Sequence, residues 1–335
     1  MATITMRSMR SSSSIFHTPS SAFKPQLQYL PLLTPRYQSS STTITEAPSA
    51  SASKVNGPSS TLPATLSLPV REPNQPFFFK YAISLGKAYA AFYKTGVKNI
   101  YHNFIASQPL QELVDTKHKG SISAAVKAGD LSRSDFQLLV RNWHDVKRIP
   151  AFALVFIICG EFTPLVVVAL SSVVPWTCRI PKQIDGDRKK LEERRKISFR
   201  NLTMPPPDNG VGVEGLERMQ LLHISWSLGL RSSMWDWLGG QLPGLPNFML
   251  RRKLRKRLKY LELDDELIRR EGGVTGMDDE EIKMACVERG IDVVGRDMGD
   301  LKTDLKRWLR SVEKVDRERL FLTRPNMWPA KPDMK

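Results

Sequence analysis

Seven cations within nine residues form the densest run of charge in the chain. Only Leu254 and Leu258 interrupt the run, whose basic residues are Arg251, Arg252, Lys253, Arg255, Lys256, Arg257 and Lys259. Leucines four positions apart share one face of a helix, so the pattern predicts a helix with one buried seam and cations over the rest of its surface. Such a surface either neutralises the phosphates of RNA or faces lipid headgroups or solvent.

A second candidate lies within an apolar stretch. Residues 151–174 carry a single charged side chain, Glu161, and Pro164 follows three positions later. An unpaired carboxylate surrounded by lipid costs roughly 3 kcal/mol, so Glu161 predicts either a proton or cation relay or a contact with another helix. Pro164 removes one backbone hydrogen bond and should kink the helix.

No motif of an enzyme or a metal site accompanies these residues. The sequence lacks HExxH, P-loop, dinucleotide-binding and nucleophile-elbow patterns, and its five histidines are dispersed. The cysteines, Cys159, Cys178 and Cys286, do not have the spacing of metal ligands. We therefore expect no catalytic residue, cofactor, metal ion or small-molecule substrate.

The N-terminus has the composition of an organelle-targeting sequence. No Asp or Glu precedes Glu46, and Arg and Ser are mixed with apolar residues. We expect a mitochondrial presequence over residues 1–37, with a chloroplast transit peptide as the alternative. A disordered linker rich in Ser, Thr and Pro should follow over residues 38–76.

The apolar stretch predicts one transmembrane helix at residues 149–176. A helix over residues 151–174 would be about 36 Å long, against about 30 Å of hydrocarbon in a bilayer. Trp143 and Trp176 flank it as interfacial aromatic residues do. Four Lys or Arg lie in the twenty residues upstream and eight in the twenty downstream, so the positive-inside bias places the C-terminal side in the matrix.

The elements on both sides of this stretch should be helical. Residues 77–148 predict a membrane-proximal segment whose first helix carries Lys80, Lys87, Lys94 and Lys98 along one stripe. That helix either lies on an anionic membrane surface or packs against its own domain. A second helix over residues 134–148 should lead into the span.

The C-terminal part, residues 177–330, predicts a basic helical domain. The chain has a formal net charge of +16, most of it beyond residue 50, which favours anionic partners. Residues 213–238 have a helical core pattern. Residues 277–310 predict a helix–extended–helix unit, similar to the SAP module, in which Asp278 and Glu281 form an acidic capping box.

Several segments together resemble the LETM family of leucine-zipper, EF-hand-containing transmembrane proteins, over about residues 77–330. They are Glu161-x-x-Pro164, the run LRRKLRKRLKYLELDDELIRREGG after Phe248, the MACVERG unit and Leu305–Leu309. The resemblance implies an all-α protein with a single transmembrane helix and a helical, 14-3-3-like ribosome-binding domain in the matrix. The chain has no EF-hand loop and no sustained heptads, so calcium sensing is not implied.

Three functions follow as hypotheses. The first is a non-enzymatic inner-membrane protein that binds the mitochondrial ribosome, through rRNA or a ribosomal protein, and anionic lipids, and supports potassium/proton homeostasis. The second is a direct component of a cation/proton exchanger that uses Glu161. The third is a SAP-like nucleic-acid-binding module on a membrane anchor. A homo-oligomer remains an open alternative in each case.

Overall fold

All regular elements in the described part of the chain are helical, which confirms the all-α expectation. The computed structural model describes residues 54–69, 78–159, 173–230 and 245–328. The α-helices are α1 (Phe78–His118), α2 (Ile122–Ala128), α3 (Arg133–Val146), α4 (Ile149–Cys159), α6 (Pro181–Arg200), α7 (Arg218–Ser227), α9 (Asn247–Arg270), α10 (Asp279–Glu288), α11 (Met298–Ser311) and α12 (Arg317–Leu322). Short 3-10 helices are η1 (Ser59–Thr61), η3 (Trp176–Cys178), η4 (Val213–Gly215), η5 (Val274–Gly276) and η6 (Pro325–Met327).

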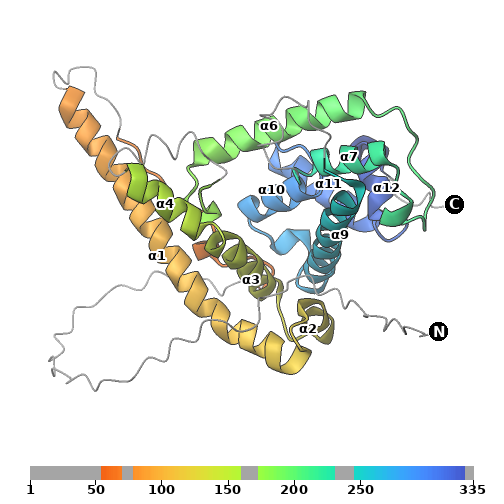
Figure 1. Ribbon diagram of the computed structural model, residues 1–335, viewed down its shortest axis with the longest axis horizontal. Coiled ribbons are helices and arrows are strands. Elements are labelled where there is room, and N and C mark those ends of the chain that lie inside the picture. The colour runs from red at the N-terminus through yellow and green to blue at the C-terminus, as the bar shows by residue number, and fades with distance from the viewer. Residues whose placement is uncertain (1–53, 70–77, 160–172, 231–244, 329–335) are drawn as a thin grey trace, which may run out of the picture.

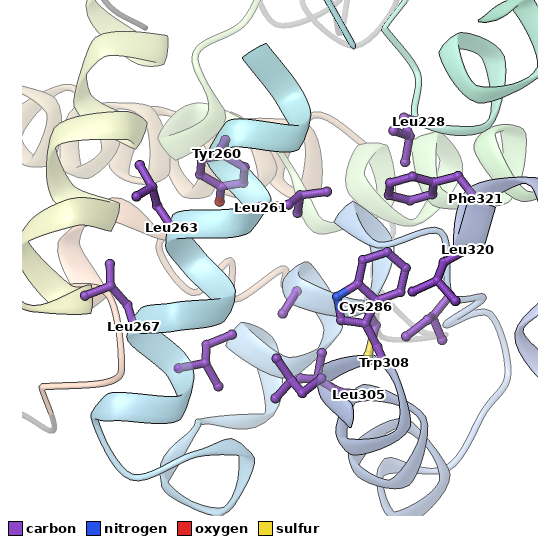
Figure 2. Close-up of a cluster of buried hydrophobic side chains, with 14 of the residues drawn as sticks. Leu228, Tyr260, Leu261, Leu263, Leu267, Cys286, Leu305, Trp308, Leu320 and Phe321 are labelled. Carbon is purple, nitrogen blue, oxygen red and sulfur yellow. The ribbon is translucent and has the colours of Figure 1, made fainter. Parts of the chain in front are cut away.

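The helices form two groups that share one core. Figure 1 shows α3 and α4 lying along the long helix α1. The helices α6, α7 and α9 to α12 form a second group, to the right of these three. Figure 2 shows the core around α9, where Leu261 faces the C-terminal helices and Leu263 and Leu267 lie on the opposite side of α9. Trp308 is fully buried, with its ring centroid 5.2 Å from that of Phe321 and 5.1 Å from that of Trp328.

The predicted helices before the apolar stretch are present, with different bounds. The first one continues as α1 to His118, and its lysines Lys87, Lys94 and Lys98 are exposed as one stripe. Exposed Val97 and Tyr101 lie among these lysines, so cations and apolar groups share this side of the helix. The packed side of α1 carries Phe92, Ile100 and Val114 instead.

Two expectations about the C-terminal domain need correction. The helix predicted over residues 213–238 ends within the described residues at Ser227, because Gly229 adopts a positive φ of 63°. Residues 231–244 lie outside the described part. Asp278 is the N-cap of α10, but its side chain makes no capping hydrogen bond, and Glu281 is buried instead of reaching back to it.

Part of the predicted linker is an ordered segment. Residues 54–62, which we call the N-terminal strap, lie across the domain, with Val55 fully buried. The Ser134 N–H donates to the Lys54 carbonyl at 2.9 Å, and Asn56 exchanges hydrogen bonds with Gly276 and Asp278. The expectation of a disordered linker over residues 38–76 is therefore corrected for residues 54–69, while residues 38–53 and 70–77 lie outside the described part.

The predicted transmembrane helix is described only at its two ends, as α4 and residues 173–176, and Glu161 and Pro164 lie outside the described residues. No helix in the described ranges combines the length and the apolar character needed to cross a membrane. The flanks of the stretch touch each other, because the Asp145 carboxylate accepts hydrogen bonds from the Trp176 and Thr177 amides at 2.5 and 3.3 Å. A single crossing would separate these flanks by about 30 Å, so the contact differs from the single-pass expectation.

Gly96 allows η3 to pack closely on α1. A Cβ atom at Gly96 would lie 2.8 Å from the Cys178 Sγ and 3.3 Å from the Thr177 carbonyl oxygen. Both distances are shorter than ordinary contacts, so any larger residue must push η3 away from the helix. Gly86, on the same helix, would meet nothing within 4 Å.

We expect Gly96→Ala to lower the melting temperature of the purified protein, measured by circular dichroism. In an open helix position the same substitution is favourable by about 1 kcal/mol, because alanine is the better helix former. Gly86→Ala is the matched control and should leave the melting temperature unchanged or raise it. Equal melting temperatures for the two variants would show that η3 does not depend on the close approach at Gly96.

Candidate basic surface of helix α9

The C-terminal half of α9 is anchored by two fully buried carboxylates, Asp264 and Asp265. Arg289 Nη2 lies 2.7 Å from both Asp264 Oδ2 and Asp265 Oδ1. Arg133 from α3 donates to Asp264 at 2.8 Å, and Arg317 from α12 donates to Asp265 at 2.9 Å. These ion pairs tie α9 to helices that are distant in the sequence.

Glu281 extends the same network to α10. Arg141 donates two hydrogen bonds to its carboxylate, at 2.6 and 2.9 Å, and Arg133 donates a third at 3.1 Å. Burial alone would raise the pKa of Glu281, but Arg141 and Arg133 outweigh it and hold the pKa below its usual value. The pKa of Asp264 is lowered in the same way, with burial outweighed by Arg133 and Arg289.

The network determines which side of α9 faces outward. The expected leucine seam is present, since Leu254 is fully buried and Leu258 packs against the core. Because the seam and the buried carboxylates hold the helix in one rotation, its N-terminal half presents a constant set of residues to solvent.

Five of the seven predicted basic residues make contacts within the protein. Their partners are backbone carbonyls and carboxylates: Arg251 with the Leu216 carbonyl, Lys253 with the Leu230 carbonyl, Arg255 with Glu214, Arg257 with Glu288 and Lys259 with Glu262. Arg252 and Lys256 are exposed and have no partner among the described residues. The run is therefore less uniform than its sequence suggests.

Four of the cations share one side of α9. Arg252, Arg255, Lys256 and Lys259 follow the spacing i, i+3, i+4, i+7, and we call them the basic face. The Arg255–Glu214 ion pair joins side chains that are 60% and 66% exposed, so it is weak and leaves Arg255 available to another anion. The structure brings these four residues together and turns Arg251, Lys253 and Arg257 toward the protein.

Helix α6 carries a further set of cations that sequence reasoning missed. Lys190 is one exposed member, and four others are Lys182, Lys189, Lys196 and Arg200. Their spacing of seven, seven and four residues is the signal that could have identified them, because it repeats one side of a helix. Other cations and two glutamates lie between these residues in the segment 188–196, and they made the regular spacing hard to recognise.

The unit that resembled a SAP module is part of the core. Leu301, Leu305 and Trp308 of α11 are fully buried, and the Trp308 indole donates to Asp265 at 3.2 Å. These contacts indicate a packing role for the unit. Among the described residues, no group of His, Cys, Asp and Glu side chains is arranged to hold a metal ion.

Comparison with known proteins finds two family models, whose matched regions meet between α6 and α7. A family model described as "LETM1-like, RBD" matches residues 208–327, and one described as "Pentamidine resistance factor domain" matches residues 110–206. No curated protein and no solved structure matches the chain. The basic face lies within residues 208–327. Arg133 and Arg141 lie within residues 110–206, so the buried ion pairs join the two matched regions.

We expect Asp265→Ala to destabilise the protein by about 3–5 kcal/mol, because it leaves Arg289 and Arg317 without their shared carboxylate. Chemical denaturation followed by circular dichroism measures this loss. Glu214→Ala removes only the ion pairs of an exposed carboxylate with Arg251 and Arg255, and should change the free energy of unfolding by less than about 1 kcal/mol. Similar losses for both variants would contradict the anchoring role of the buried pair.

The lowered pKa values of Asp264 and Glu281 predict sensitivity to acid. The unfolded chain holds these protons more tightly than the folded protein, so protonation favours unfolding. The stabilisation is present above the ordinary pKa values of 3.8 and 4.5, and it is lost as the pH falls through the lower folded values. The melting temperature should therefore drop below about pH 4.5. Glu281→Gln should lower it at neutral pH and make the acid decline shallower; a constant melting temperature of the unmutated protein down to about pH 3 would refute the assignment.

Proposed function

We propose that this chain is a LETM-type mitochondrial inner-membrane protein whose matrix domain binds the mitochondrial ribosome, because residues 208–327 match the family model described as "LETM1-like, RBD". The observation that carries the proposal is the basic face of α9, which lies within the matched LETM1-like RBD. In this role the protein supports translation at the membrane and, through it, potassium/proton homeostasis. It acts by binding and not by catalysis.

The mechanism is neutralisation of phosphates on ribosomal RNA. Arg252, Arg255, Lys256 and Lys259 would replace counterions condensed on the RNA, and the released ions drive binding. The buried ion pairs and the leucine seam hold α9 in one orientation, so the helix itself needs no rearrangement to meet a phosphate backbone. Arg255 and Lys259 would exchange their pairs with Glu214 and Glu262 for phosphates. Arginine adds paired hydrogen bonds to phosphate oxygens, which lysine does not.

The location in the cell rests on other parts of the chain. The composition of residues 1–37 supports import into mitochondria. The apolar residues 149–176 support attachment to the inner membrane, with its acidic lipids as a second anionic partner. The cations that flank this stretch on both sides support a matrix position for the domain.

The test is cosedimentation of the purified protein with mitochondrial ribosomes. We expect the triple variant Arg252→Glu, Arg255→Glu and Lys256→Glu to lose most of the binding. The affinity of the unmutated protein should fall steeply with salt, and the logarithmic slope of the variant should be smaller by about 2–3.

A matched variant separates the basic face from overall charge. Lys117→Glu, Lys119→Glu and Lys127→Glu change the net charge equally, at exposed positions on and after α1. This control should bind ribosomes nearly as well as the unmutated protein. Unchanged cosedimentation of the α9 variant, or an equal loss in both, would refute the basic face as the binding site.

A further inference from the structure

The described ends of the apolar stretch meet at one place on the domain. Val174 is buried against Ile100 of α1 and against Cys178 of η3. Phe152 and Val155, in the first turns of α4, pack against the same cluster. Together with the hydrogen bonds of Asp145 to the residues of η3, these contacts join the point where the chain departs to the point where it comes back.

Buried ion pairs give independent evidence that both flanks lie on one side of a membrane. Arg133 and Arg141 precede the stretch, whereas Asp264 and Glu281 follow it. A bilayer between them would separate these charges by about 30 Å of hydrocarbon. The N-terminal strap gives the same evidence. It precedes the apolar stretch, and its Asn56 bonds to Gly276 and Asp278, which follow the stretch.

The outer side of α4 is exposed and aliphatic. Leu154, Ile157 and Ile158 are 57%, 77% and 73% exposed, and the helix carries no charged residue over Ile149–Cys159. A soluble surface seldom presents such a group of large aliphatic side chains without a partner. The 11 residues of α4 extend about 16 Å, which is the depth of one leaflet.

The base of α4 has the chemistry of a membrane interface. Trp143 is 42% exposed, and exposed Lys147 and half-buried Arg148 follow it directly before the helix. On the returning side, the Arg179 guanidinium lies over the Trp176 ring at 5.4 Å. Tryptophans together with cations are typical of headgroup depth, where anionic phosphates are available.

We propose that α4 enters an anionic lipid bilayer as a re-entrant anchor, from which the chain returns to the side where both helical groups lie. The aliphatic side chains of α4 occupy the hydrocarbon of one leaflet, and the exposed Lys147 meets lipid phosphates at its base. This topology goes beyond the proposed function and does not depend on binding to ribosomes. It replaces the single crossing that hydropathy alone favours.

Cysteine labelling on vesicles tests the topology. The full chain is added from detergent to preformed vesicles of phosphatidylcholine and phosphatidylglycerol, and a membrane-impermeant maleimide is applied from outside. Lys127→Cys precedes α4 and Lys189→Cys follows it, both at exposed positions. Cys159, at the end of α4, is replaced by serine in every variant, and the chain carrying only this change gives the background. Its other cysteines, Cys178 and Cys286, are buried, and burial raises the pKa of both thiols to about 12.

We expect both added cysteines to be labelled before detergent is added, to the same extent as after it. A single crossing would protect one of the two positions until the vesicles are opened, and this result would overturn the proposal. Loss of ribosome binding would not affect this result, so the anchor and the proposed function fail separately.

A second variant tests the lipid-facing side chains. Ile157→Glu should reduce flotation with anionic vesicles at least tenfold, while Met327→Glu, at an equally exposed position outside the anchor, should leave flotation unchanged. Lys147→Glu should remove the preference for anionic over neutral vesicles. If Ile157→Glu floats as well as the unmutated protein, the exposed face of α4 does not contact lipid; self-association through this face, seen by sedimentation without lipid, would also refute the proposal.

Discussion

The architecture depends on a buried set of three arginines and three carboxylates. Arg133, Arg141 and Arg289 pair with Asp264, Asp265 and Glu281, and all six side chains are nearly or fully buried. Removing charges from water is costly, and only complete pairing with good geometry compensates for it. The six groups satisfy one another only when α3, α9 and α10 occupy one arrangement. The ion pairs thereby favour one packing of the helices, which contacts between apolar helix surfaces alone would define less sharply.

The same buried ion pairs matter for function as well as for stability. The matched regions 110–206 and 208–327 would be two separate units if only the chain linked them. The pairs Arg133–Asp264 and Arg141–Glu281 make them one body, so the anchor on one region and the basic face on the other keep a constant relation. A ribosome bound at α9 would therefore be held at a defined distance from the membrane rather than on a flexible tether.

Periodicity in the sequence predicted the helical character of the chain, but not all of the helix ends. Leucine spacing predicted the seam of α9, and the composition predicted helices throughout the described ranges. The roles of the charged residues were not predictable in this way. Asp264 and Asp265 belong to a highly charged helix, so their sequence context is typical of surface residues. The arginines that pair with them in the interior are 24 to 131 positions away in the sequence. Hydropathy likewise measures the length of an apolar segment but carries no information about whether its two ends meet.

The N-terminal strap sets a boundary for maturation. Any peptidase that removes a leader must cut before Lys54, since the residues that follow supply the Val55 carbonyl to Arg133 and the Asn56 side chain to Gly276. A polypeptide trimmed back to α1 would retain every described α-helix, yet it would lack the buried Val55 side chain and the Val55 carbonyl that accepts from Arg133. A cut after Lys54 would therefore leave the interior of the domain incomplete even though the α-helices remain.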